Sequence, residues 1–230
     1  GACPYYARVN KARIDGNGQV EVLTPEQATH EAYFSKSGRY FVDNYSRADL
    51  EPRSVLRDNK GKVILELASP DLTRLYETGW KMPEPFTVKA ADGHTDLYGF
   101  MWKPFDFDST RRYPIISYVY PGPQTEAIPL EFSVTAAYNV GLAQVGFVVV
   151  TFGHRGGSPM RDKWYHTFGY NNLRDYPLAD DKCGIEQLAD RFSFIDKSKV
   201  GIFGHSGGGF MSTAALCTYP DFYTAAVSSA

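Results

Sequence analysis

The stretch from Val200 to Gly209 constrains the fold of this chain more than any other. An apolar run passes directly into the cluster Gly204-His205-Ser206-Gly207-Gly208-Gly209. A short apolar run of this kind is typical of a strand buried on both faces. The sequence therefore predicts a strand over Lys199–Phe203, a tight turn at Ser206 and a helix over Gly207–Cys217.

The spacing Gly204-x-Ser206-x-Gly208 between a strand and a helix is the pattern of a nucleophile elbow. Such a serine lies in a strained turn, and its neighbours must be small so that the backbones can approach each other. The helix N-terminus then points at the reaction centre, where it stabilises a developing anion. In the alternative interpretation Ser206 only caps the helix, but capping would not require glycines on both sides. Ser206 is therefore the candidate nucleophile.

The second half of the chain alternates between strand and helix patterns. Such alternation predicts a parallel sheet covered by helices, an α/β domain. The expected strands are Phe86–Ala91, Asp96–Lys103, Pro114–Tyr120, Gly146–Phe152, Lys199–Phe203 and Ala225–Ser228. Helices are expected over Phe132–Val145, Leu178–Arg191 and Gly207–Cys217, from the spacing of their apolar residues.

The first half, from Tyr5 to about Leu67, reads as strands separated by glycine-containing turns. The first of these strands is expected over Tyr5–Ile14. Antiparallel strands of this kind suggest about one blade of a β-propeller, and a small independent sheet is the alternative. A short helix should follow, with Ser69 as its N-cap and Gly79 at its end. We expect two domains. Residues 1–80 would form the blade and the connecting helix, and 81–230 the N-terminal part of an α/β-hydrolase catalytic domain.

Tyr120 ends one of the predicted strands, directly before Pro121-Gly122-Pro123. Residues at the carboxyl ends of sheet strands lie on the rim that faces a ligand. The phenol of Tyr120 and the backbone N–H of Gly207 are therefore candidates for the two donors of an oxyanion hole. A buried structural tyrosine is an equally open interpretation of Tyr120.

A complete catalytic triad cannot be assembled from these residues. In α/β hydrolases the acid and the base follow the nucleophile along the chain, but Asp221 is the only acidic residue after Ser206 and no histidine follows it. His205 should point away from Ser206. Asp180 and Asp181 are expected to open a helix, where acidic residues suit the helix dipole, so that a capping role is favoured over catalysis. Arg155 is expected to anchor a loop by pairing with a carboxylate or with backbone carbonyls.

Composition excludes several other classes of protein. The net charge is −2, with both signs well mixed, which gives no electrostatic reason to expect a nucleic acid or an anionic membrane as partner. No apolar run reaches the roughly 20 residues of a membrane span. The widely spaced Cys3, Cys183 and Cys217 predict neither a disulfide framework nor a zinc site. We expect no metal and no cofactor.

Four stretches together resemble the dipeptidyl peptidase IV group of the prolyl oligopeptidase family. They are Tyr113–Ile116 leading to Val119–Pro123, Arg155–Ser158 with Asp162-Lys163, the pair Asp180-Asp181, and Gly204–Gly209. The likeness covers about residues 86–230, and the β-rich start is similar to the last propeller blade of the family.

This resemblance implies that Ser206 attacks a peptide carbonyl and that Tyr120 and the Gly207 amide form the oxyanion hole. It also implies an aspartate and a histidine from beyond residue 230. The full-length protein would be a serine exopeptidase that releases dipeptides or short pieces from peptide N-termini. Its propeller would restrict substrates to short peptides. A homodimer and a periplasmic or secreted bacterial setting are typical of the family.

The residues on either side of Ser206 depart from the family pattern. Dipeptidyl peptidase IV has Trp before and Tyr after its nucleophile, whereas this chain has His205 and Gly207. That Tyr lines the pocket for the proline-side residue, so the resemblance does not carry a proline preference over to this chain. The alternatives are an acylaminoacyl peptidase, an oligopeptidase or an esterase of the same fold, or a catalytically silent relative that binds peptides.

Overall fold

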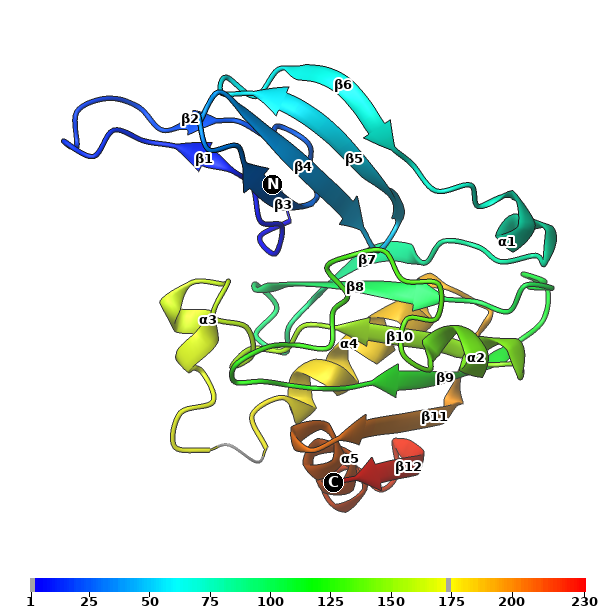
Figure 1. Ribbon diagram of the computed structural model, residues 1–230. Helices are drawn as coiled ribbons and strands as arrows, with labels where there is room; N and C mark the ends of the chain where they lie inside the picture. The colour runs from blue at the N-terminus through cyan, green and yellow to red at the C-terminus, as the bar shows by residue number, and fades with distance from the viewer. Residues whose placement is uncertain (1–2, 173–174) are drawn as a thin grey trace. The chain divides into compact units, whose positions relative to one another are not determined.

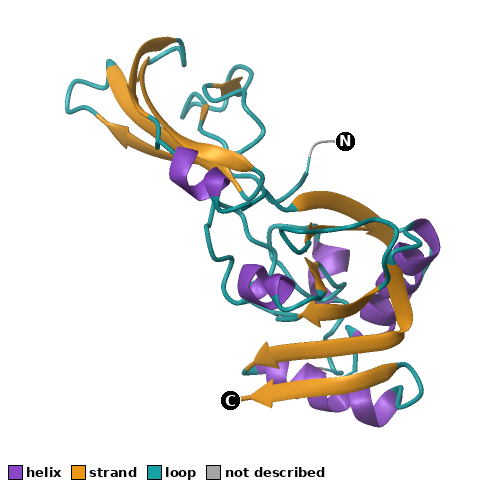
Figure 2. Ribbon diagram, turned by 90° about the vertical axis from the view of Figure 1, so that its right-hand side faces the viewer, coloured by secondary structure: helices purple, strands orange, loops and turns teal. Residues whose placement is uncertain are grey.

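A computed structural model describes residues 3–172 and 175–230. The described residues form two compact units, one with residues up to 82 together with 129–133, the other with 83–128 and 134–230. Figure 1 shows the order of the elements along the chain and Figure 2 their type. Each unit has its own sheet.

The first unit is built on a four-stranded antiparallel sheet. Its order is β3-β4-β5-β6, with β3 over Thr29–Phe34, β4 over Tyr40–Arg47, β5 over Leu50–Asp58 and β6 over Val63–Ala68. Gly38 and Gly61 adopt positive φ angles of 65° and 84° in two of the connecting turns, as glycine readily does. The predicted turns at these glycines, and the antiparallel strands around them, are confirmed.

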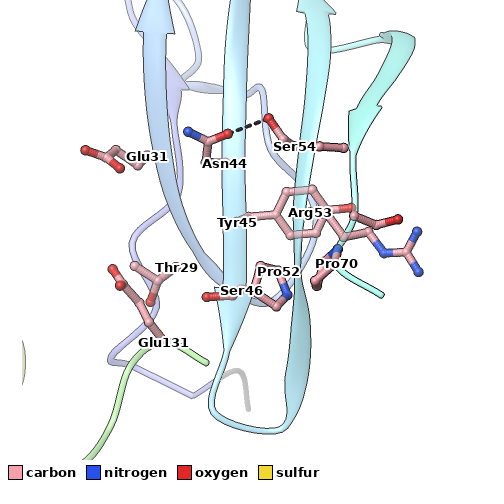
Figure 3. Close-up of a pocket in the computed structure, with 12 residues that line it drawn as sticks. Thr29, Glu31, Asn44, Tyr45, Ser46, Pro52, Arg53, Ser54, Pro70 and Glu131 are labelled. Atoms are coloured by element: carbon pink, nitrogen blue, oxygen red, sulfur yellow. Dashed lines mark hydrogen bonds between the residues drawn. The ribbon is translucent and has the colours of Figure 1, made fainter. Parts of the chain in front are cut away.

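One face of this sheet holds a pocket of about 390 Å³ (Figure 3). Its walls carry acidic, basic and amide side chains, among them Glu31, Asn44, Arg53 and Glu131. The Ser54 hydroxyl donates to Asn44 Oδ1 at 2.6 Å. Among the residues that line it, no nucleophile lies beside a base, and we assign no chemistry to the pocket.

The prediction of a long first strand from Tyr5 to Ile14 was wrong. Only β1 over Asn10–Lys11 forms, and it pairs with β2 over Glu21–Val22. The residues before β1 do not continue a regular backbone ladder, because the Val9 N–H donates to the side-chain hydroxyl of Thr24 at 2.8 Å. A side-chain acceptor thus takes the place of a strand partner.

The connecting helix, α1, is shorter than expected and spans Thr73–Glu77. Ser69 does not cap it, since Leu72 is the N-cap residue and the Asp71 carboxylate accepts the Thr73 N–H at 3.0 Å. Gly79 ends the helical turn as predicted, with φ of 86°.

The predicted helix over Phe132–Val145 was also largely wrong. Only α2, Asn139–Gln144, is helical. Upstream, the Phe132 N–H donates to Ser46 Oγ at 3.1 Å, and the Phe132 ring lies 5.7 Å from that of Trp80. These contacts hold residues 129–133 in the first unit, and a helix cannot begin there.

The second unit has a six-stranded mixed sheet in the order β12-β11-β9-β10-β8-β7. The strands are β7 (Glu84–Lys89), β8 (Asp96–Trp102), β9 (Tyr113–Tyr118), β10 (Val148–Phe152), β11 (Ile195–His205) and β12 (Tyr223–Ser229). The predicted parallel pairing is confirmed for β9 to β12, whereas β8 is antiparallel to both neighbours. The reason is the tight turn at Gly93, which returns the chain beside β7.

Helices α4 (Leu178–Arg191) and α5 (Gly207–Thr218) contribute to the core of the second unit, whereas α3 (Lys163–Thr167) is a short helix in the loop after β10. The extent of α4 matches the prediction. Ile185 and Leu188 of α4 and Met211 of α5 pack with Val150 and Ile202 of the sheet in one core. Each fully buried side chain of this kind contributes about 1.5–3 kcal/mol.

An apolar hollow of about 430 Å³ lies on the opposite face of the same sheet. The rings of Tyr118 and Phe203 stack in it, with their centroids 4.8 Å apart. Tyr138, which directly precedes α2, and Leu142 within α2 also line it. Val227 of β12 is 66% exposed there. Among the described residues, no helix combines the length and apolar character that crossing a bilayer requires.

Candidate active site

Ser206 lies in the sharp turn between β11 and α5. Its backbone has φ of 56° and ψ of −119°, a conformation that a residue with a side chain adopts only at a cost of about 1–3 kcal/mol. It occupies the N-cap position of α5, yet its side chain makes no capping hydrogen bond, and the residue is exposed. The capping interpretation of Ser206 is therefore not supported.

Three of the glycines around Ser206 are required by close backbone contacts. A Cβ added to Gly204 or Gly208 would lie 2.4 or 2.0 Å from the Val119 carbonyl oxygen, and one added to Gly209 would lie 2.2 Å from the Ser229 oxygen. Real Cβ atoms do not approach so closely. The turn is thus packed against the ends of the strands on both sides of β11.

Gly207 differs from these three glycines. A Cβ at this position would lie 3.6 Å from the Gly122 oxygen and 3.8 Å from Cε2 of Tyr120, both ordinary contact distances. Packing therefore does not require glycine here. Gly207 is also the first residue of α5, where a backbone N–H has no acceptor within its own helix.

Tyr120 lies just beyond the end of β9, and its ring is next to Gly207. Its phenol oxygen accepts a hydrogen bond from the Gln124 side-chain amide. The residue after it, Pro121, has its carbonyl oxygen bound by the Tyr176 hydroxyl at 3.0 Å. The structure thus brings together Ser206, Gly207 and Tyr120, the three residues singled out from the sequence. Gln124 and Tyr176 were missed, because no local pattern links them to Tyr120.

His205 bonds away from the nucleophile. Its Nδ1 lies 3.0 Å from the Ser229 hydroxyl oxygen of the neighbouring strand. This agrees with the prediction that the imidazole of His205 does not act as the base for Ser206.

Asp180 and Asp181 lie in the first turn of α4, as predicted, but the expected capping role was wrong, because the N-cap residue is Pro177 and no side chain makes a capping hydrogen bond there. Both carboxylates are fully buried and bind residues outside the helix. Asp181 accepts hydrogen bonds at 2.7 Å from the hydroxyls of Ser117 and Tyr223 and lies 3.1 Å from His154 Nε2. We call these four residues the Asp181 cluster, and it links β9, α4, β12 and the loop after β10.

The charge of Asp181 changes the titration of its partners. Burial opposes protonation of His154, but the hydrogen bond and charge of Asp181, with Asp180 and Glu126 nearby, outweigh burial and raise the pKa of the imidazole. Burial and then Asp181 raise the pKa of the Tyr223 phenol well above its usual range. Tyr223 therefore stays a proton donor to Asp181 at neutral pH.

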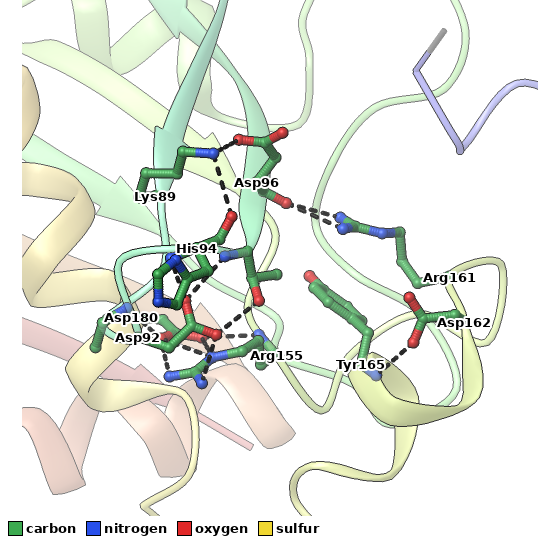
Figure 4. Close-up of polar contacts among 11 residues, drawn as sticks. Lys89, Asp92, His94, Asp96, Arg155, Arg161, Asp162, Tyr165 and Asp180 are labelled. Atoms are coloured by element: carbon green, nitrogen blue, oxygen red, sulfur yellow. Dashed lines mark hydrogen bonds and ion pairs between the residues drawn. The ribbon is translucent and has the colours of Figure 1, made fainter. Parts of the chain in front are cut away.

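Arg155 anchors its loop as predicted (Figure 4). Its guanidinium binds the buried Asp180 carboxylate, with an Nη2–Oδ1 distance of 2.8 Å, and Asp92 at 3.0 Å. Asp180 also accepts the Ala91 N–H at 2.9 Å. The Arg155 ion pairs thus connect α4 to the turn between β7 and β8.

One group of potential metal ligands lies among the described residues, in the first unit. Atoms of Glu26, His30 and Asp43 come within 4.8 Å of one another. The Arg57 guanidinium already lies between the carboxylates, with Nε donating to Asp43 at 2.8 Å and Nη2 at 2.9 Å from Glu26. Because this cation already pairs with both carboxylates, we infer a structural ion network there and no metal site.

Comparisons with known proteins agree on one family. Residues 132–230 match the sequence profile of the prolyl oligopeptidase family. Dipeptidyl peptidase 8 of Homo sapiens is 29% identical over 229 residues, an alignment that covers 93% of this chain and 24% of the relative. The chain therefore spans about a quarter of the length of the curated relatives it matches.

Solved structures give the same result. A candidate dipeptidyl aminopeptidase IV from Bacteroides ovatus superimposes with a TM-score of 0.79 at 29% identity, over 93% of this chain and 30% of that chain. Porphyromonas gingivalis dipeptidyl peptidase 4 has a TM-score of 0.81 at 24% identity, over 98% of this chain and 31% of that chain, which supports the fold alone.

Proposed function

Because this chain belongs to the prolyl oligopeptidase family of serine peptidases, in its dipeptidyl peptidase IV-like group, we propose that Ser206 is the nucleophile of a peptidase that cleaves short pieces from peptide N-termini. One observation carries the proposal. The exposed Ser206 lies in a strained strand-to-helix turn, with the Tyr120 ring beside the N-terminus of the helix that follows.

The reaction follows from the roles of these groups. Ser206 Oγ forms a bond to the scissile carbonyl carbon while a base takes its proton. The negative charge on the carbonyl oxygen is stabilised by the Tyr120 hydroxyl and the Gly207 N–H. The C–N bond then breaks, the amine leaves with the proton, and water hydrolyses the acyl-enzyme to free Ser206.

The base and the acid that orients it are proposed to lie beyond residue 230. A triad without these members retains only weak catalysis. We therefore propose that the 230-residue chain is inactive by itself. The full-length polypeptide, whose peptide substrates and homodimeric state are part of this proposal, would be active.

A direct test is covalent labelling of the full-length polypeptide with a fluorophosphonate, followed by mass spectrometry of the peptide that contains position 206. We expect labelling at Ser206, loss of labelling in Ser206→Ala, and a fall of about 10⁶-fold in kcat for a dipeptide chromogenic substrate. His205→Gln is the matched control and should keep its activity. Labelling at another serine, or turnover in Ser206→Ala, contradicts the proposal.

Substrate preference is the finer part of the proposal. Because Gly207 has no side chain where the dipeptidyl peptidase IV group has Tyr, residues larger than proline would be accepted beside Ser206. This keeps acylaminoacyl peptidase, oligopeptidase or esterase activity as the second candidate. The test compares turnover of three kinds of substrate: dipeptide substrates with Pro, Ala, Leu or Phe before the cleaved bond, an N-acetylated alanine substrate, and an ester. Exclusive cleavage of the acetylated substrate would favour the second candidate.

The domain assignment is likewise a proposal. Residues 1–80 would form a propeller blade with its connecting helix, and 81–230 the N-terminal part of the catalytic domain. Two features support a blade, the four-stranded antiparallel sheet and the exposed apolar residues of β6, among them Ile64 and Leu65. A blade leaves such residues for neighbouring blades to cover.

A further inference from the structure

We propose that Tyr176, Glu126 and Tyr165 form a clamp that positions Tyr120, so that they act on catalysis through its phenol without touching the substrate. This inference rests on the proposed function, since it assumes that Tyr120 donates to the oxyanion. The clamp joins the segment 121–126, which follows Tyr120, to the loop 154–157 and to Tyr165 and Tyr176. Its contacts lie at two ends and in the middle.

The first end of the clamp is Tyr176. Its hydroxyl donates to the carbonyl oxygen of Pro121 at 3.0 Å, directly after Tyr120. Tyr176 is 8% exposed, and its ring lies against Gly156 and Gly169. A Cβ added to Gly156 would lie 2.5 Å from the ring, and one added to Gly169 would lie 2.7 Å from it. Packing therefore holds the ring, and one hydrogen bond transmits its position to the backbone beside Tyr120.

Tyr176 keeps its proton in this environment. Burial, followed by the charges of Glu126 and Tyr120, raises the pKa of Tyr176 to about 12. Its hydroxyl is consequently a donor to Pro121 across the whole neutral range.

The second end is Glu126. Its Oε1 accepts the Tyr165 hydroxyl at 2.6 Å and the His154 N–H at 3.2 Å. Its Oε2 is buried and has no partner among the described residues. The side chain is thus held through one oxygen only, and Tyr165, which is 4% exposed, supplies the stronger of the two bonds.

The middle of the clamp is a contact between two backbones. A Cβ on Gly122 would lie 2.8 Å from Cα of Gly157, and one on Gly157 would lie 2.1 Å from Glu126 Oε1. The same Gly122 carries the carbonyl oxygen that lies 3.6 Å from the Cβ position of Gly207. Gln124 and Thr125, between the two ends, are exposed. The contacts at Pro121, Gly122 and Glu126 therefore determine where this loop lies relative to the Ser206 turn.

Loss of one end should lower kcat more than it raises KM. A donor displaced by about 1 Å stabilises the oxyanion less, at a cost of up to about 100-fold in rate, whereas ground-state binding changes little. Tyr176→Phe removes one hydroxyl and keeps the ring in place. We expect its kcat to fall by about tenfold, with KM within about twofold.

The decisive experiment is a double-mutant cycle in the full-length polypeptide, with Tyr120→Phe, Tyr176→Phe and the double variant. If Tyr176 acts through the Tyr120 hydroxyl, then Tyr176→Phe has no further effect once that hydroxyl is gone. Equal fold-losses with and without the Tyr120 hydroxyl overturn the inference. Tyr170→Phe is the matched control, because its phenol is in the same segment and is 57% exposed.

A second set of variants tests the other end of the clamp. Glu126→Gln keeps an oxygen acceptor for Tyr165 and should restore most of the kcat that Glu126→Ala loses. Tyr165→Phe should match Glu126→Ala and show the same dependence on the Tyr120 hydroxyl. Failure of Glu126→Gln to rescue, while its thermal midpoint is unchanged, counts against the clamp.

The two proposals fail in different ways. Normal fluorophosphonate labelling of Ser206 combined with additive losses in the cycle overturns the clamp and leaves the peptidase proposal standing. Turnover that survives Ser206→Ala overturns the peptidase proposal itself.

Discussion

The second unit contains two groups of polar residues that differ in almost every respect, the Ser206 turn and the Asp181 cluster. Ser206 is exposed, its backbone is strained, and its side chain makes no capping hydrogen bond. Asp181 is fully buried and accepts hydrogen bonds from two hydroxyls while it pairs with His154. The difference fits the proposed function, in which the turn would serve chemistry while the cluster serves the stability of the sheet.

The largest expected effect is a loss of stability when the Asp181 cluster is mutated, and a small loss would contradict this division of roles. Asp181→Ala leaves His154 and two hydroxyls buried without their acceptor, and should lower the free energy of unfolding by about 3–5 kcal/mol. Denaturant titration of the full-length polypeptide measures this. Asp190→Ala, on the same helix but with a side chain that is 75% exposed, is the control and should change little.

A loss of activity with unchanged stability is expected at the turn. Tyr120→Phe removes one of the two proposed oxyanion donors and should lower kcat by about tenfold to a thousandfold. Steady-state kinetics on a dipeptide substrate, together with a thermal midpoint, separate the two effects. Unchanged turnover would remove Tyr120 from the mechanism, and a large fall in midpoint would assign it to the core instead.

The glycines of the turn sharpen the comparison, because they combine both roles. Gly208→Ala places a Cβ 2.0 Å from the Val119 oxygen and should destabilise the protein by about 1–3 kcal/mol, whereas Gly207→Ala meets nothing closer than 3.6 Å. We expect Gly207→Ala to keep its stability and to alter only the preference for the substrate side chain. Equal unfolding free energies for the two variants would show that the turn is less tightly packed than its contacts indicate.

The smallest expected effect is a dependence of stability on pH. Since the folded pKa of His154 is raised, its contribution to stability is complete below about pH 6.5, the unfolded value, and is lost as pH rises through the folded pKa. For each unit by which the folded pKa of His154 exceeds the unfolded value, the unfolding free energy should fall by about 1.4 kcal/mol over this rise in pH. Urea titrations between pH 6 and pH 9 measure it, and His154→Gln should flatten the profile.

Several parts of the fold could be predicted because they depend on local patterns. The helix over Leu178–Arg191 and the buried strand that ends near Phe152 follow from the spacing of apolar residues within each segment. The turn at Ser206 follows from glycines at close spacing. Prediction failed where distant residues compete for a segment. Contacts with Ser46 and Trp80 hold Phe132 out of the expected helix.

The candidate site divides in the same way. Ser206, Gly207 and Tyr120 were identified from their positions at the ends of predicted strands and at the start of a helix, and the structure places the Tyr120 ring next to Gly207. Glu126, Tyr165 and Tyr176 carry no such local signal. Their hydrogen bonds join residues that are 39 and 55 positions apart in the chain.

The sequence by itself therefore determined the strand–turn–helix unit that presents Ser206, since glycine spacing and apolar periodicity act over a few residues. Only the tertiary structure decided that Asp181 is buried beneath the sheet and that Tyr176 holds the backbone beside Tyr120. The physical reason is that burial and long-range hydrogen bonds depend on which segments pack together, and no short stretch of sequence contains both partners.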